Sequence, residues 1–145
     1  MKITVIEIDD AQEEEIILRC HRSSAAAAQF LGGSSATPRT VAGTKDGQIY
    51  RLTLDDIYYF ETVENKSFIY CKDAVYETRL KLYEFERLCQ GSDLFRCSRS
   101  MVLNSGKIDH LSPSLSGRFE VTLVGGEKVI VSRQYVDELK KLIGM

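Results

Sequence analysis

The chain has 145 residues, of which 43% are hydrophobic and 28% are charged, a composition typical of a globular protein able to bury a core. This composition excludes wholesale disorder, and no apolar stretch approaches the ~20 residues that a membrane-spanning helix needs. The formal net charge is −2. Residues 1–40 carry four basic and six acidic side chains, whereas residues 41–145 carry fifteen of each, so any basic surface is expected to be local.

The first 38 residues read as a small α+β unit that ends in a linker rich in glycine and serine, residues 32–38. Alternation of polar and apolar residues over 3–8 predicts a strand, and residues 9–12 predict a turn. Residues 14–20 fit either a second strand or the start of a helix, and residues 23–31 a short capped helix. A unit this small cannot bury a core of its own, so we expect it to dock on the rest of the chain or to serve in dimerisation. The alternating N-terminus is unlike a signal peptide, which favours a cytoplasmic location.

Residues 39–145 predict a mainly β domain with short helices. Short strand patterns are separated by turn signals, and no alternation of helix and strand suggests a parallel sheet. Helices are expected over residues 81–90, with Leu82, Phe85, Leu88 and Cys89 on one face, and over 134–143, with Val136, Leu139 and Leu142 on one face. The expected strands are 40–44, 48–53, 57–62, 67–71, 75–78, 95–103, 108–112, 118–123 and 128–132.

Catalytic and metal-binding patterns are missing from the sequence. It contains no nucleophile elbow, no P-loop, no dinucleotide fingerprint and no zinc-protease motif. The four scattered cysteines form no C-x-x-C pair, and His110, inside an apolar strand pattern, is interpreted as structural. The sequence therefore predicts neither an enzyme nor a cofactor, metal or small-molecule substrate.

Two segments instead combine arginine, glutamine and serine where strand patterns break. The first runs Phe-Arg-Cys-Ser-Arg-Ser over residues 95–100, and the second Ser-Arg-Gln over 132–134. Arginine and glutamine suit bidentate contacts with guanine and adenine edges in the major groove, and serine hydroxyls suit phosphate oxygens.

The order and spacing of these segments resemble the LytTR family of bacterial DNA-binding domains. The matching stretches, in chain order, are residues 56–61, 79–85, 95–104 and 131–136, so the resemblance extends over about residues 41–143. It implies an elongated domain of about ten mostly antiparallel strands, and a transcription regulator that presents loops to successive major grooves of double-stranded DNA. The whole chain also resembles small stand-alone regulators of this family, for which two linked copies reading repeated half-sites are expected.

The resemblance also assigns DNA-reading positions, which carry over to three places in this sequence. The first is Lys66 or Ser67, with the alternative left open. The second is Arg99 with Ser98 and Ser100, and the third is Arg133 and Gln134 with Ser132. The resemblance further implies four core residues, Phe60, Phe95, Val102 and Ile108. Many relatives carry a receiver domain of about 120 residues, whereas only about 40 residues precede the DNA-binding domain here, so we do not expect control through a receiver aspartate.

Two alternatives accompany this interpretation. The near-neutral charge also fits a protein-interaction or sensory β-module that does not bind DNA, in which the resemblance is only architectural. Cys97, beside Arg96, could be a redox-sensitive thiol whose pKa is lowered by positive charge, or simply a small core residue.

Overall fold

The computed structural model describes residues 4–17, 19–21 and 39–145, and the chain divides into two units, Met1–Pro38 and Arg39–Met145. In the first unit the described residues form neither strand nor helix, so the predicted strand over residues 3–8 is wrong for residues 4–8. A strand requires a hydrogen-bonded neighbour, and alternation of residue types alone does not supply one. The strand or helix predicted over 14–20 is likewise wrong for the described residues 14–17, 19 and 20, while the helix over 23–31 lies outside the described residues. The turn over 9–12 is confirmed by a hydrogen bond from Gln12 N to the Asp9 carbonyl (3.2 Å).

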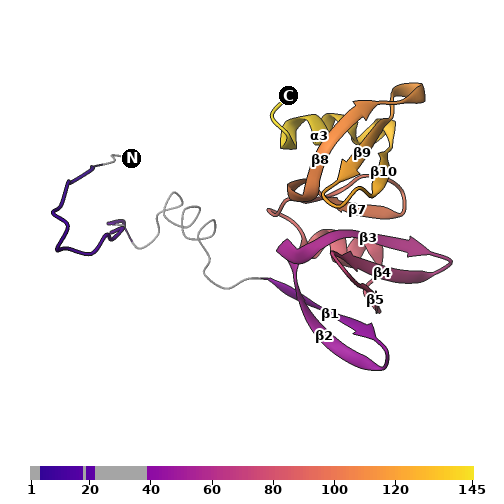
Figure 1. Ribbon diagram of the computed structural model, residues 1–145, viewed down its shortest axis with the longest axis horizontal. Helices are drawn as coiled ribbons and strands as arrows, with labels where there is room; N and C mark the ends of the chain where they lie inside the picture. Colours follow the sequence, from indigo (N-terminus) through magenta and orange to yellow (C-terminus); the bar gives the residue numbers. More distant parts are fainter. Residues whose placement is uncertain (1–3, 18, 22–38) are drawn as a thin grey trace. The chain divides into compact units, whose positions relative to one another are not determined.

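The second unit confirms the mainly β prediction, with ten antiparallel strands and two short α-helices in the described chain (Figure 1). Seven strands form one sheet in the order β2-β1-β5-β4-β3-β7-β6, and three form a second sheet in the order β10-β9-β8. The single strand predicted over 95–103 is wrong, because the chain reverses after Arg96 and β6 pairs antiparallel with β7. The helices are α2 (Leu82–Leu88) and α3 (Val136–Leu142). The strands are β1 (Thr40–Lys45), β2 (Gln48–Thr53), β3 (Ile57–Val63), β4 (Lys66–Cys71), β5 (Val75–Thr78), β6 (Leu94–Arg96), β7 (Met101–Asn104), β8 (Ile108–Pro113), β9 (Phe119–Leu123) and β10 (Lys128–Val131).

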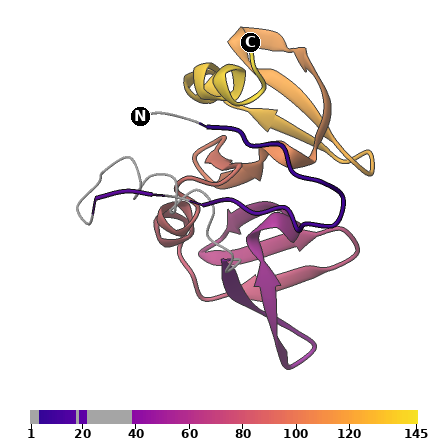
Figure 2. The ribbon, with the colours of Figure 1, turned by 90° about the vertical axis from the view of Figure 1, so that its left-hand side faces the viewer.

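The large sheet buries residues on both of its faces. On one face α2 packs against the sheet through Phe85, whose ring stacks on Phe60 with 4.3 Å between centroids. The other face packs with the small sheet and α3, which Figure 2 shows beside each other in orange and yellow. Neighbouring residues of a strand therefore enter different cores, since side chains alternate across a strand. Val102 lies in the first core and Leu103 in the second.

Burial confirms most of the expected core residues and corrects three. Phe60, Phe95 and Val102 are buried, and Ile108 is partly buried. Leu88 and Leu142, predicted on the inner faces of their helices, are exposed because each lies in the last turn of a seven-residue helix. His110, interpreted as structural, is also exposed, and its Nδ1 lies 2.7 Å from Oδ2 of the neighbouring Asp109. No helix among the described residues is long and apolar enough to cross a membrane.

Candidate nucleic-acid interface

Two segments form the centre of the candidate interface. The 97–100 loop joins β6 to β7, and the 132–134 turn joins β10 to the short 3₁₀ helix Arg133–Tyr135. A hydrogen bond from Ser132 N to the Cys97 carbonyl (2.9 Å) links them. Although they are more than 30 residues apart in sequence, the fold therefore brings both arginine-containing segments together.

A third segment, the β3–β4 turn, is connected to the same loop. Thr62 N donates a hydrogen bond to the Ser100 carbonyl (2.8 Å), so the end of β3 lies beside the 97–100 loop. Glu64 and Asn65 both have positive φ, as in the two-residue turns that suit β-hairpins. Lys66 directly follows this turn and is exposed, whereas Ser67 is buried and its hydroxyl lies 3.4 Å from that of Thr62. Of the two positions left open by the sequence, only Lys66 presents its side chain to solvent.

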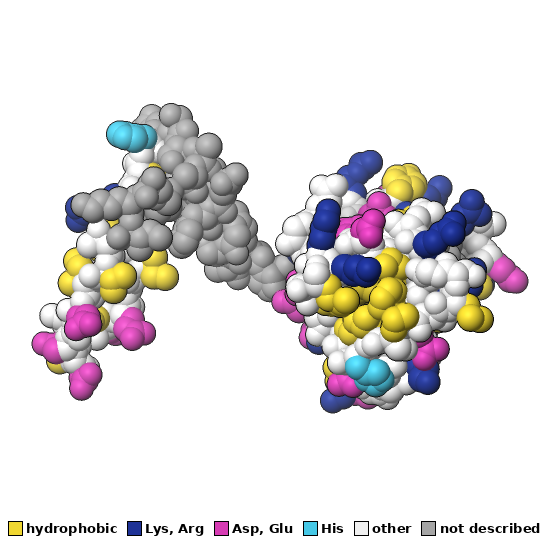
Figure 3. All heavy atoms as spheres, turned by 90° about the horizontal axis from the view of Figure 1, so that it is seen from above, with side chains coloured by type: hydrophobic (Ala, Val, Ile, Leu, Met, Phe, Trp, Pro, Cys, Tyr) yellow, Lys and Arg dark blue, Asp and Glu magenta, His cyan; other side chains and the backbone are white. Residues whose placement is uncertain are grey.

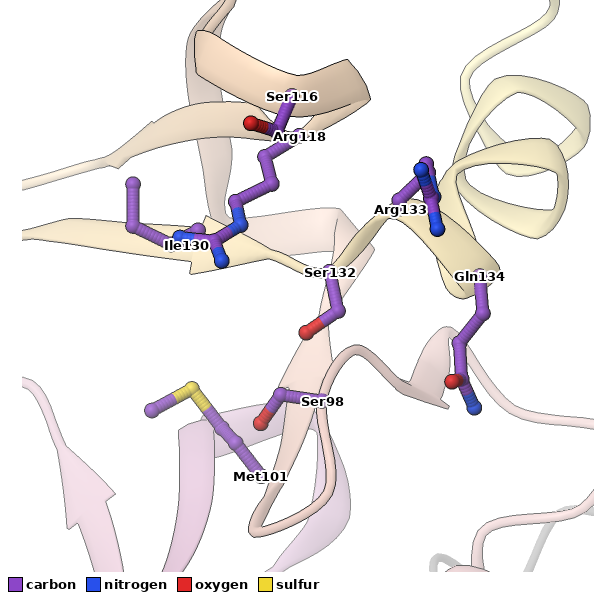
Figure 4. Close-up of a pocket in the computed structure, with 8 residues that line it drawn as sticks. All are labelled: Ser98, Met101, Ser116, Arg118, Ile130, Ser132, Arg133 and Gln134. Atoms are coloured by element: carbon purple, nitrogen blue, oxygen red, sulfur yellow. The ribbon is translucent and has the colours of Figure 1, made fainter.

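Four of the predicted site residues line one hollow of about 660 Å³. In Figure 4 the side chains of Ser98 and Ser132 lie one below the other with their hydroxyls directed to the same side, while Arg133 and Gln134 diverge from the same turn. Arg99 and Ser100 belong to the adjoining loop but do not line the hollow, and Arg99 is exposed. The hollow thus combines hydroxyl, amide and guanidinium groups, all of which can hydrogen-bond a nucleic acid.

The sequence did not point to four further residues of this hollow. Ser116 and Arg118 come from the β8–β9 connection, Ile130 from β10 and Met101 from the start of β7. Ile130 could have been found from strand alternation, since its neighbours Val129 and Val131 are buried and it must point to the other side. Ser116 and Arg118 carry no such signal, because the position of their loop depends on how the small sheet packs.

The 132–134 turn is held closely against the β8–β9 connection. Gly117 has a φ of +74°, and a Cβ there would lie 3.0 Å from Cδ and 3.1 Å from Cγ of Arg133. The aliphatic part of the Arg133 side chain therefore packs on a position where only glycine fits without displacing it.

Residues 41–145 carry equal numbers of basic and acidic side chains, and the surface of the second unit reflects this balance. Figure 3 shows Lys and Arg interspersed with Asp and Glu on the viewed face of the second unit. In the part of the chain that the structure describes, no group of three or more His, Cys, Asp or Glu side chains could hold a metal ion.

Cys97 is a core residue, and the redox interpretation is wrong because it assumed that Arg96 lowers the pKa of the thiol. The thiol is fully buried in the second core and donates a hydrogen bond to the Met101 carbonyl (3.6 Å). Burial raises its pKa to about 12, and this effect outweighs the opposing effect of Arg96. Because the thiolate is the reactive form, a buried thiol with a raised pKa is inert.

Comparison with known proteins assigns the domain. The family model described as the LytTr DNA-binding domain matches residues 47–144. The chain belongs to the LytTR family. The LytTR domain of a putative methyl-accepting/DNA response regulator from Bacillus cereus has the same fold, with a TM-score of 0.68 at 24% identity over 73% of this chain and 97% of that one.

Relatives of the LytTR domain occur in longer regulators. The sensory transduction protein LytT of Enterococcus faecalis is 29% identical over 138 residues, which cover 92% of this chain and 57% of LytT. The transcriptional regulatory protein YpdB of Escherichia coli is 31% identical over 105 residues, covering 72% of this chain and 43% of YpdB. The chain thus spans about half of the length of these relatives.

Proposed function

We propose that this protein is a transcription regulator that binds double-stranded DNA sequence-specifically, through loops that enter the major groove. The observation that supports this most strongly is the series of backbone hydrogen bonds between Thr62 and Ser100 and between Cys97 and Ser132. They hold together the three segments in which the candidate DNA-reading residues lie. Three neighbouring loops that are linked in this way can contact the same DNA duplex.

Each candidate side chain has a chemical role in this proposal. Arg133 and Arg99 recognise guanine edges, and Gln134 recognises adenine, through paired hydrogen bonds in the major groove. Lys66 neutralises phosphate. The hydroxyls of the site bind phosphate oxygens and fix the register of the protein on the duplex; they belong to Ser98, Ser100 and Ser132.

Two copies of the chain bind together in this proposal. Small loop contacts from one domain give weak binding, and linking two copies raises the effective concentration at the second half-site. The unit Met1–Pro38 is the dimerisation element, and the exposed Val5, Ile6, Ile16 and Ile17 in its described part offer apolar surface for that contact. Half-sites one helical turn apart, about 10–10.5 base pairs, match the repeat of the major groove. A regulator that binds chromosomal DNA acts in the cytoplasm.

The test is titration of labelled duplexes from the promoter of a regulated gene, with the wild type, Arg99→Ala and Arg133→Ala. Each variant should lose about 1–3 kcal/mol of binding free energy on the specific site and relax the base preference at one position. Arg51→Ala is the matched control, because Arg51 is exposed on β2, at the opposite edge of the large sheet from β6. It should bind like the wild type. Duplexes with one half-site should bind more weakly than duplexes with two.

The salt dependence of binding separates this proposal from a protein-interaction module. DNA binding should weaken steeply with added salt, because phosphate neutralisation releases counterions. A wild type that shows no salt-dependent binding to any duplex would contradict the proposed function. If Arg51→Ala weakened binding as much as Arg99→Ala and Arg133→Ala, the assignment of the site would be wrong.

A further inference from the structure

Arg96, at the end of β6, makes an unusual set of contacts with the loop that follows it. Its Nε donates a hydrogen bond to the Ser98 carbonyl (2.5 Å), and its Nη2 donates one to the Arg99 carbonyl (2.6 Å). One planar guanidinium thus binds two consecutive carbonyls of the 97–100 loop. Lysine could not reproduce this, because its ammonium group lacks the fixed fork of donors.

The third contact of Arg96 joins it to helix α2. Nη1 donates a hydrogen bond to Oε2 of Glu86 (2.8 Å). The preceding residue, Phe85, is fully buried and stacks on Phe60, so the helix that carries Glu86 is fixed to the large sheet. The guanidinium is therefore held from a rigid helix on one side and holds the loop on the other.

Peptide geometry gives this arrangement a consequence for the other side of the loop. In a planar trans peptide the carbonyl and the following N–H point in opposite directions. Because the carbonyls of Ser98 and Arg99 point at Arg96, the N–H groups of Arg99 and Ser100 point away from it. Ser100 N donates to the Ser98 hydroxyl (3.3 Å), which orders that side of the loop as well.

We propose that Arg96 and Glu86 are positioning residues, which hold the 97–100 loop in the conformation that binds DNA without themselves contacting it. This inference rests on the proposed function and deepens it. The side chain of Arg96 is only 24% exposed, and all three of its nitrogens already donate to acceptors within the protein. It fixes where Arg99 and the neighbouring hydroxyls stand.

The positioning role can be tested by whether Glu86→Gln strengthens or weakens DNA binding. Glu86→Gln removes a negative charge near the interface, which by electrostatics alone should strengthen binding to a polyanion. A positioning role predicts the opposite, because the neutral amide of glutamine attracts the Arg96 guanidinium less than the Glu86 carboxylate does, so Arg96 is held less firmly. We expect Glu86→Gln to weaken specific binding by about three- to tenfold, and Arg96→Lys by about tenfold or more, since it loses the fork.

Glu138→Gln is the matched control. Glu138 on α3 and Glu86 line the same groove, so the same charge is removed from nearly the same place. This control should bind DNA as well as the wild type or slightly better. A second measurement needs no DNA: amide hydrogen exchange in the free protein. Exchange at Ser98 and Ser100 should be faster in Arg96→Lys, while the amides of the core strands should keep wild-type rates.

Three results would overturn the positioning role. The first is a wild-type affinity in both Glu86→Gln and Arg96→Lys, with unchanged exchange in the loop. The second is stronger binding by Glu86→Gln. The third is an Arg96→Met variant that weakens binding equally on every sequence and lowers the salt slope by about one, since the loss of one released counterion identifies Arg96 as a phosphate contact. In each case the wild type still binds its duplex, so the proposed function stands. A wild type that binds no duplex contradicts the proposed function, while the exchange measurement still tests the loop.

Discussion

The 97–100 loop and the 132–134 turn lie side by side but are supported in different ways. The loop is held by a charged side chain, through the hydrogen bonds of Arg96 to its carbonyls. The turn is held by apolar packing, since Val131 before it is fully buried and Val136 after it is buried as well. A backbone bond from Tyr135 N to the Ser132 carbonyl (2.9 Å) closes the turn.

This difference predicts that the two segments respond to different perturbations. The polar support depends on charge and geometry, and the Glu86–Arg96 pair is partly exposed, so it adds little to global stability. The apolar support belongs to the second core, so its loss destabilises the whole domain. Changes to the loop should therefore alter DNA binding more than stability, whereas changes behind the turn should alter both.

Among the changes that test this difference, Leu139→Ala should have the largest effect on stability. Leu139 in α3 is fully buried in the second core, which also contains Val131 and Val136. We expect the free energy of unfolding to fall by about 2–5 kcal/mol, because the lost methyl groups leave a cavity. Chemical denaturation measures this. DNA binding should weaken even at temperatures where the variant is folded, because the turn loses its support.

Leu142→Ala is the control for this prediction. Leu142 lies on the same helix but is 41% exposed, so the same truncation should cost well under half as much. Equal destabilisation by the two variants would contradict the prediction that the buried face of α3 contributes more to stability than its exposed face.

The next largest effect concerns Cys97, the first residue of the loop, in alkaline solution. Burial raises the pKa of its thiol from 9.0 to about 12, so the folded protein keeps the proton that the unfolded chain releases. Stability from this group is complete below pH 9 and is lost as the pH rises towards 12. At pH 10 the loss should be about 1.4 kcal/mol for one thiol.

Urea unfolding at pH 8, 9 and 10 measures this loss. Cys97→Ala should flatten the fall in stability between pH 9 and 10, although Cys89, whose pKa burial also raises to about 12, will still contribute. Cys20→Ala is the control, because Cys20 is exposed and should leave the slope unchanged. A Cys97→Ala variant with the wild-type slope would contradict the prediction.

Much of the second unit could be predicted from local sequence patterns. The β1–β2 hairpin follows from the Lys-Asp-Gly turn, where Asp46 and Gly47 have positive φ. The burial of Phe60 and Val102 in the core was also expected, from the resemblance to the LytTR family. The bulge in β3 was not, and it turns both Tyr58 and Tyr59 towards the second core.

The candidate site shows where sequence reasoning ends. The arginine-containing segments were found from residue types and the resemblance, but their contact depends on one hydrogen bond between the sheets, Ser132 to Cys97. The place of Arg118 in the hollow depends on the packing of the small sheet, and the role of Arg96 depends on how the 97–100 loop folds back on its side chain and on where α2 places Glu86. Contacts of these kinds leave no periodic signal in the chain.

The smallest effect should come from Gly117→Ala, which tests how the turn is held from outside the core. The φ of +74° at Gly117 should cost alanine about 1 kcal/mol of stability, and the new Cβ would meet the Arg133 side chain at 3.0 Å. We expect Arg133 to shift and specific DNA affinity to fall by a few fold in a binding titration. Gly47→Ala is the matched control, because its φ of +77° imposes a similar strain while no atom lies within 4 Å of the added Cβ. It should lose the same stability and keep wild-type DNA affinity; a loss of affinity in both variants would mean that backbone strain alone, and not the contact with Arg133, weakens binding.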